Sequence, residues 1–186
     1  MCRARKNKGF TNVRIVLILL MVFIHNNLSP QSDINTLKAV AIEKIALFIT
    51  WPPGSLSNQE FTIGILGDNP ITETLKQIYL EKKIKDLRVN IVEIKDIESI
   101  TSSCQLLFIP KIKMAELNKL LKHTSNKPIL TISDTKGFAE AGCMINFYVY
   151  ENKLRFELNQ KGMDEAGFKI DYRLLKVSKI INPVIE

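Results

Sequence analysis

The chain reads LTISDTKGF over residues 130–138 and GCMINF over residues 142–147. The first block is an apolar strand that ends in polar residues and a Gly-Phe turn, and the second block opens another strand. Small and polar groups therefore converge where one crossover of an α/β sheet begins, which is where such sheets usually hold their functional residues. We expect a candidate site at this point of the fold.

Strand patterns and helix patterns alternate outward from these blocks. Helices are expected over residues 34–49, 71–79, 113–122 and 163–181, and strands over residues 61–66, 88–94, 104–109, 128–133, 144–150 and 153–158. Met114 should lie on the buried side of its helix, and Glu151-Asn152 signals a hairpin between the last two strands. The predicted fold is α/β: a three-layer, Rossmann-like domain with a mostly parallel sheet of about six strands flanked by helices and an antiparallel hairpin at its C-terminal edge.

The net charge of +7 is concentrated near the start of the chain. Of the 186 residues, 26 are Lys or Arg, and five of these lie in residues 1–32, which contain no acidic residue. The remainder carries 21 basic against 19 acidic side chains and is close to neutral. The basic balance therefore gives no reason to expect a nucleic-acid partner.

The leader has the layout of a secretory signal. Its basic residues precede a run of ten apolar residues, 15–24, which would span about 15 Å as a helix. That is about half of a bilayer core, so export is favoured over a stable transmembrane helix. No small-x-small cleavage triplet follows the run, so residues 1–32 are interpreted as a signal peptide or, alternatively, an uncleaved membrane tether, and residues 33–186 as a single domain.

Two cysteines remain in the predicted domain, Cys104 and Cys143, each at the start of a strand. In an oxidising compartment they could form a disulfide, but the starts of strands that are not neighbours lie more than about 7 Å apart at their α-carbons. The alternative is two small buried hydrophobic side chains. The domain contains one histidine, His123, which leaves too few ligands for a metal site, and we expect no cofactor.

Six blocks in order carry a resemblance to the YfiR family. They are Phe48-Ile49-Thr50-Trp51-Pro52, Ile63 to Asp68, Cys104 to Ile109, Leu130 to Asp134 with Gly137-Phe138, Gly142 to Phe147, and Arg155 to Asn159. The resemblance runs from about residue 35 to residue 182. Cys143 stands where the family pattern usually has a second glycine, and the additional cysteine pairs of some members are absent.

The resemblance implies an exported periplasmic protein with no catalysis of its own. Members of the YfiR type bind the periplasmic sensor part of a membrane diguanylate cyclase and repress it, which lowers cyclic di-GMP and biofilm formation. Similar domains also occur beside or within sensor kinases, so the alternative is a small-molecule-binding module that feeds a sensor histidine kinase. The resemblance further implies a homodimer.

Several polar and aromatic residues of these blocks are candidates for binding a partner or ligand. Trp51, held by Pro52, is either a rigid interface anchor or a cap on the core. Ser133 and Asp134 are adjacent on a strand and point to opposite faces, which favours capping of the following turn over a catalytic pair. Arg155, Glu157 and Asn159 share one strand face, which is either a solvated face or the polar wall of a groove. The full candidate set is Trp51, Pro52, Ser133, Asp134, Gly137, Phe138, Asn146, Arg155, Glu157 and Asn159.

Motifs of common enzymes are absent from the sequence. It has no Gly-x-Ser-x-Gly elbow and no His-Glu-x-x-His pair. His123 lies beside a lysine near a helix end, where we expect it to stabilise the helix C-terminus rather than to act as a base. The sequence therefore favours a binding protein over an enzyme.

Overall fold

The computed structural model describes residues 30–56 and 59–182, with side chains from residue 34 onward. The chain divides into two units, Met1–Asp33 and Ile34–Glu186, and the fold described below is that of the second unit. Most of the predicted leader, residues 1–29, lies outside the described residues.

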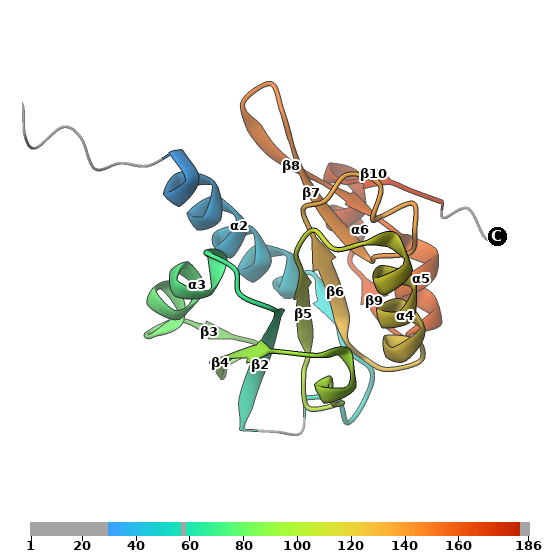
Figure 1. The fold of residues 1–186 in the computed structure, drawn as a ribbon, viewed down its shortest axis with the longest axis horizontal. Coiled ribbons are helices and arrows are strands. Elements are labelled where there is room, and N and C mark those ends of the chain that lie inside the picture. Colours follow the sequence, from blue (N-terminus) through green and yellow to red (C-terminus); the bar gives the residue numbers. More distant parts are fainter. Residues whose placement is uncertain (1–29, 57–58, 183–186) are drawn as a thin grey trace, which may run out of the picture. The chain divides into compact units, whose positions relative to one another are not determined.

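One large sheet organises the second unit (Figure 1). Its eight strands lie in the order β10 (Lys179–Ile180), β8 (Lys153–Leu158), β7 (Ile145–Tyr150), β6 (Leu130–Ser133), β5 (Leu106–Ile109), β2 (Glu60–Leu66), β4 (Leu87–Ile94) and β3 (Lys83–Ile84). The pairs β7–β8 and β3–β4 are antiparallel, and the other five pairs are parallel. A separate antiparallel pair joins β1 (Ile49–Thr50) to β9 (Lys169–Ile170).

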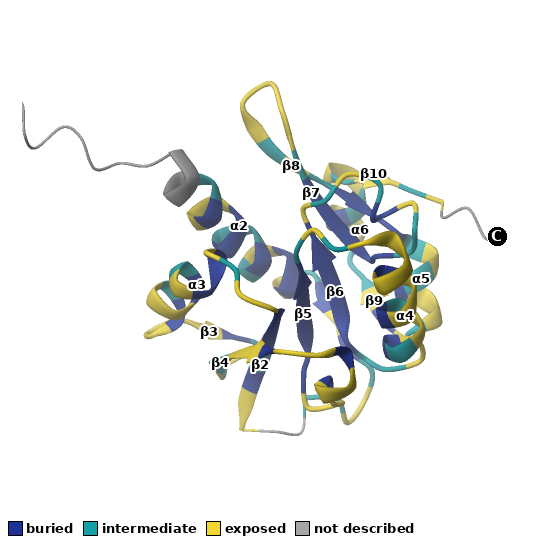
Figure 2. Cartoon of the chain, in the orientation of Figure 1, coloured by how far each residue is buried: buried dark blue, intermediate teal, exposed yellow. Residues whose placement is uncertain are grey.

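Helices cover both faces of the sheet, and each face has its own hydrophobic core. The helices are α2 (Pro30–Leu47), α3 (Ile71–Tyr79), the short 3₁₀ turn η1 (Ile97–Ser99), α4 (Met114–Thr124), α5 (Gln160–Glu165) and α6 (Tyr172–Val177). One cluster packs Ile42 of α2 and Leu75 of α3 against Phe108 and Phe147 of the strands. The other packs Leu117 and Leu120 of α4 against the opposite face. The buried central strands stand out in Figure 2.

The predicted α/β class, three layers and mostly parallel sheet are confirmed. The eight strands exceed the predicted six because β3 and β10 contain only two residues each, too few to produce an alternating pattern in the sequence. The predicted hairpin is β7–β8, and the two-residue β10 lies outside it at the edge of the sheet.

The predicted helix over residues 163–181 is wrong. This segment instead contains the end of α5, strand β9, helix α6 and strand β10. Gly167 has a φ of 79°, which ends α5, because a left-handed residue cannot continue a right-handed helix. Asp171 then starts α6 by accepting a hydrogen bond from the backbone N–H of Arg173 at 2.9 Å, and hydrogen bonds from Arg173 lower the pKa of Asp171 to about 2.

Met114 was also predicted incorrectly. Its side chain is 49% exposed, because it lies in the first turn of α4 and faces a surface groove, whereas Leu117 and Leu120 of the same helix are fully buried. Among the described residues, no helix has the length and apolar character needed to cross a membrane.

Candidate functional site

A row of polar side chains crosses four neighbouring strands on the face of the sheet that α4 covers. Ser133 is in register with Asn146, Asn146 with Glu157, and Glu157 with Lys179. Residues in register point to the same face, so β6, β7, β8 and β10 place these groups side by side. Sequence reasoning proposed the first three as site residues but could not align them, because the register is set by pairings between distant segments.

Glu157 is the charged centre of this row. It is 8% exposed, and its carboxylate accepts hydrogen bonds from Asn146 Nδ2 at 3.2 Å and from Lys179 Nζ at 2.9 Å. The hydrogen bond and charge of Glu157 raise the pKa of Lys179. The side-chain carbonyl of Asn146 is buried without a hydrogen-bond partner among the described residues. The ion pair between Glu157 and Lys179 therefore joins β10 to β8.

Ser133 and Asp134 bind different partners. The Ser133 hydroxyl donates to the carbonyl of Ile109 at 2.8 Å and accepts from the backbone N–H of Thr135 at 3.2 Å, which is a turn-capping contact. Asp134 forms an ion pair with Lys38 of α2. Lys38 is only 8% exposed, and α2 lies on the other side of the sheet from α4. The two side chains therefore do not form a catalytic pair. Lys38 was missed in the sequence; the signal was a lysine within the apolar pattern of the first helix.

Trp51 is a core residue in this structure, which corresponds to the second of the two roles that the sequence left open. The indole is 5% exposed and makes edge contacts with Phe61 and Phe168, at centroid distances of 5.3 and 5.5 Å. Its Nε1 donates to the carbonyl of Gln105 at 3.3 Å. Pro52, also in the candidate set, lies against the turn at Gly167, where an added Cβ would be 3.1 Å from Pro52 Cγ.

Gly137 and Phe138 shape the segment that follows β6. Gly137 has a φ of 89°, a conformation that favours glycine, and it turns the chain so that Phe138 enters the second core cluster. The backbone N–H of Cys143 donates to the carbonyl of Phe138 at 2.8 Å and closes the turn. These two residues therefore support the loop that ends at Gly142.

Asn159 links this loop to helix α5. Its Oδ1 accepts from the backbone N–H of Gly162 at 2.9 Å as the helix N-cap, and its Nδ2 donates to the carbonyl of Gly142 at 3.1 Å. Both ends of the buried amide are thus satisfied within the protein.

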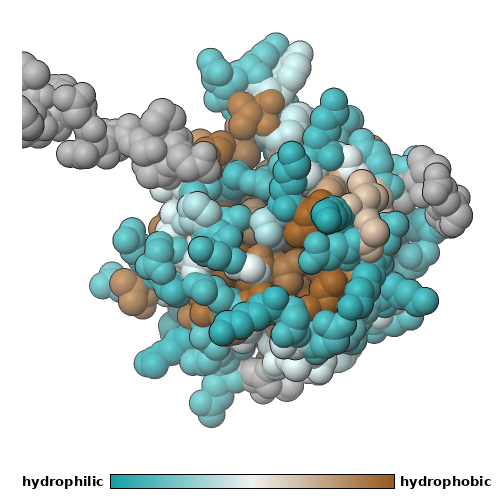
Figure 3. Space-filling model, in the orientation of Figure 1, coloured by the Kyte–Doolittle hydropathy of each residue, from teal (hydrophilic) through white to brown (hydrophobic). Residues whose placement is uncertain are grey.

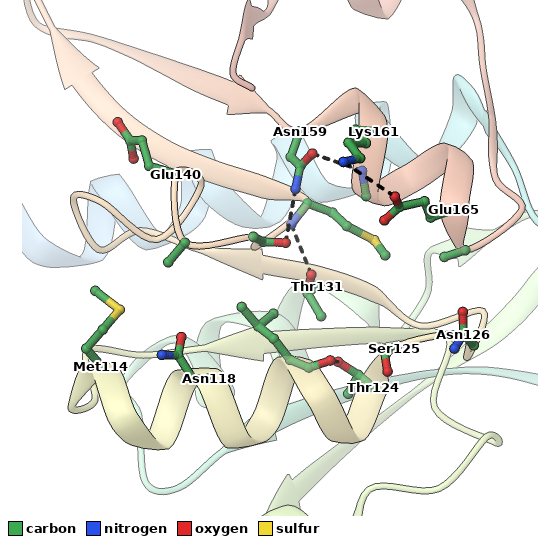
Figure 4. Close-up of a pocket in the computed structure, with 16 residues that line it drawn as sticks. Met114, Asn118, Thr124, Ser125, Asn126, Thr131, Glu140, Asn159, Lys161 and Glu165 are labelled. Carbon is green, nitrogen blue, oxygen red and sulfur yellow. Dashed lines mark hydrogen bonds and ion pairs between the residues drawn. The ribbon is translucent and has the colours of Figure 1, made fainter. Parts of the chain in front are cut away.

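A groove of about 830 Å³ lies beside Asn159, between α4 and α5 (Figure 4). Met114, Asn118, Leu121 and Ser125 line one wall at helical spacing, and Lys161 and Glu165 of α5 lie on the opposite side. Thr131, Met144 and Gly142 also contribute to the lining. The volume is within the range of small-molecule pockets, and the lining combines apolar and hydrogen-bonding groups. Of the sequence candidates, only Asn159 reaches this groove.

Arg155 lies apart from both the groove and Trp51. It is exposed on the β7–β8 hairpin, with its guanidinium 5.7 Å from the centroid of the Tyr150 ring. Arg155, Glu157 and Asn159 therefore share a strand face, but they do not form one wall: the first is exposed, the second is ion-paired and the third caps a helix.

Cys104 and Cys143 are free, buried thiols, so the possible disulfide does not form in this structure. Their sulfur atoms lie 3.0 and 3.4 Å from the carbonyls of Leu106 and Ile145, to which the thiols donate. Burial raises the pKa of Cys104 to about 11 and that of Cys143 to about 12, which keeps both protonated at neutral pH. Within the described residues, no group of three His, Cys, Asp or Glu side chains is placed to hold a metal ion.

Comparisons with known proteins give one family and several solved structures, among them that of an ABC domain. The structure of the ABC domain of a Streptococcus pneumonia protein in complex with L-Trp is 14% identical, with a TM-score of 0.48 over 75% of this chain. The chain spans 61% of the length of that structure. A comparison with curated proteins found no match. Residues 35–179 match the YfiR/HmsC-like family. The matched range includes the whole large sheet apart from Ile180 of β10. Since the match includes well over half of the sequence, the chain belongs to the YfiR/HmsC-like family.

Proposed function

We propose that this protein is an exported regulator without catalysis of its own, which binds the periplasmic part of a membrane signalling protein and represses a diguanylate cyclase. The observation that carries the proposal is the family match over residues 35–179, which spans nearly all of the second unit. Repression would lower cyclic di-GMP and biofilm formation. The protein would act from the periplasm, as a homodimer, after removal of its leader or tethered by it.

The contacts of the polar candidates support a binding role. Ser133, Asp134, Glu157 and Asn159 each have a partner inside the protein, and each contact joins or caps structural elements. A catalytic site instead requires groups that converge on a space where a substrate can lie. These residues stabilise the domain, which leaves the exposed surfaces for recognition.

A second function is favoured by the groove between α4 and α5. Its volume of about 830 Å³ suits a small molecule, so we also consider a periplasmic ligand-binding module that feeds a sensor histidine kinase. Asn118 lines the groove, is exposed and belongs to neither core cluster, so an Asn118→Trp variant would fill the space without replacing a core side chain. Loss of signalling by this variant, with partner binding unchanged, would favour the second function.

The test is an affinity pull-down of the tagged full chain from the membranes of its native cell. We expect a diguanylate cyclase to be recovered, because the proposed regulator acts through direct binding. An untagged strain controls for non-specific capture. Recovery of a histidine kinase would support the second function, and recovery of neither protein would contradict both.

A further inference from the structure

The β7–β8 hairpin forms a projecting surface that the site described above does not use. Its strands extend beyond the neighbouring strands of the sheet, and its tip is exposed (Figures 1 and 2). Tyr150 pairs with Lys153 across a two-residue turn, in which Glu151 and Asn152 have φ values of 49° and 56°. This is the backbone of a tight hairpin turn whose twist matches that of its strands, so the hairpin is held in one register.

One face of the hairpin combines tyrosine rings with cations. Tyr148 is in register with Arg155, and Tyr150 with Lys153. Arg155 lies over the Tyr150 ring at 5.7 Å, and Lys179 over the Tyr148 ring at 6.0 Å, so the rings help to orient the charges. Lys179 is already paired with Glu157, whereas Lys153 and Arg155 have no ion-pair partner among the described residues. Two uncompensated cations therefore lie two residues apart on β8.

The outer edge of β8 is unpaired beside these cations. Strand β10 is in register only with Glu157 and Leu158, and no described strand lies beside Lys153 to Phe156 on that side. The carbonyl of Leu158 accepts from Ile181 on the outer side at 2.9 Å. Because backbone groups alternate in direction along a strand, those of Leu154 also point outward. An unpaired edge of this kind can accept an additional strand.

We propose that this hairpin binds an extended acidic segment of a partner protein, which adds to the free edge of β8 and places carboxylates against Lys153 and Arg155. The inference rests on the proposed function and assigns the segment to the periplasmic part of the membrane partner. The edge is short and offers few backbone hydrogen bonds, so ionic contacts at alternate positions select the partner.

The charges of the hairpin favour an acidic segment of a partner over a second copy of this chain or a lipid surface. A second copy paired through the same edge would bring its own Lys153 and Arg155 close to these cations, and like charges across strands are destabilising. An anionic lipid surface would have to accommodate Glu151 and Asn152 at the tip, and lipids cannot complete a β-ladder. Hydrophobic side chains also lie along the hairpin in Figure 3. Val149, in register with Leu154, is exposed on the opposite face from the cations.

The test uses the full chain and a labelled decapeptide that alternates Glu and Thr. Binding is measured by fluorescence anisotropy at low and high salt. A second peptide of the same sequence carries N-methyl groups at alternate residues, which removes the hydrogen bonds of one edge and keeps the charge. The protein variant is Lys153→Glu with Arg155→Glu, and its matched control is Lys95→Glu with Lys111→Glu, which changes the net charge equally at exposed lysines elsewhere.

We expect the hairpin variant to bind the alternating peptide at least about tenfold more weakly than the control variant, because two attractive ion pairs become repulsive. The N-methylated peptide should bind the wild-type chain weakly. Equal binding by both variants, or equal binding of both peptides, would overturn the inference. Binding only to anionic vesicles or to a polyanion such as heparin would also overturn it. A membrane partner recovered equally well with wild-type and hairpin variant would refute the hairpin inference and leave the proposed function intact.

Discussion

At the residue scale, Trp51 shows how far sequence reasoning can go. A lone tryptophan locked by prolines suits either an interface or a core, and both are consistent with the sequence. The burial of the Trp51 ring depends on contacts with Phe61 and Phe168, which lie far apart in the sequence. The sequence could therefore identify the residue as important but could not place it, and the same holds for Asp134 and its partner Lys38.

Replacing Trp51 should destabilise the protein through the core. We expect Trp51→Ala to lower the free energy of unfolding by about 3–5 kcal/mol, because it removes a large ring and leaves a cavity. Trp51→Phe should cost less, since it keeps part of the ring packing. Urea denaturation measures both. A stable Trp51→Ala variant that has lost partner binding would instead restore the interface-anchor interpretation.

The two thiols should resist alkylation in the folded state. Their raised pKa values, about 11 for Cys104 and about 12 for Cys143, leave little thiolate at pH 8, and both are buried. Iodoacetamide should label neither cysteine in native buffer and both in urea, as read by mass spectrometry of the tryptic peptides. Rapid native labelling of Cys143 would show that its surroundings open readily.

The same pKa shifts predict a loss of stability at alkaline pH. The ordinary value for both thiols is 9.0, and the folded values are higher, so folding favours the protonated form. The contribution is complete below about pH 9 and is lost as the pH rises toward the folded-state values. Unfolding measured from pH 8 to pH 11 should show a smaller decline for Cys143→Ala than for wild type. A parallel decline in the two proteins would contradict this assignment.

At the element scale, local signals predicted some elements well. The bounds of α3 and β8 agree with the sequence prediction, because each has a strong period and a clear turn at its end. The segment after residue 163 failed because its apolar residues fit a helical period although Gly167 breaks the helix. The short strands β1, β9 and β10 pair with distant segments, and β3 pairs with the adjacent β4 but contains only two residues, so none of them leaves a local pattern.

Asn159 should stabilise the entry into α5. Asn159→Ala removes the cap on Gly162 and the tie to Gly142, so we expect a loss of about 1–2 kcal/mol in the free energy of unfolding. Asn159→Asp keeps the acceptor for the cap but loses the donor to Gly142, so it should lower the free energy of unfolding by less than Asn159→Ala does. Thermal and urea unfolding would test this order; equal stability of Asn159→Ala and wild type would refute it.

The Glu157–Lys179 ion pair should hold β10 in place. We expect Lys179→Ala to speed hydrogen exchange at Ile181, whose amide bonds to Leu158 on the adjacent strand. Exchange in α3, which contacts β4 near the opposite edge of the sheet, should not change. Lys176→Ala, on neighbouring α6, is the matched control. Unchanged protection of Ile181 in Lys179→Ala would show that backbone pairing alone retains the strand.

At the scale of the whole molecule, composition and order were the most informative features of the sequence. Alternating strands and helices predicted the layered α/β fold, and six ordered blocks predicted the family that the chain matches over residues 35–179. Neither could predict the groove between α4 and α5 or the free edge of β8, because both arise from how distant segments pack. The candidate site therefore had to be assigned from the structure.

The proposed homodimer is tested at the same scale. Size-exclusion chromatography with light scattering should give twice the mass of the exported chain, and this mass should persist on dilution into the micromolar range. A monomer at every concentration would remove the dimer from the account and leave the proposed partner binding in place.

The central claim is that this protein represses a diguanylate cyclase, and the most direct test is cyclic di-GMP in cells that lack it. We expect the cyclic di-GMP concentration to rise on deletion, to return to its original value when the wild-type gene is restored, and to stay unchanged when the cyclase recovered with the protein is also deleted. An unchanged concentration after deletion, or an increase that persists without that cyclase, would contradict the account.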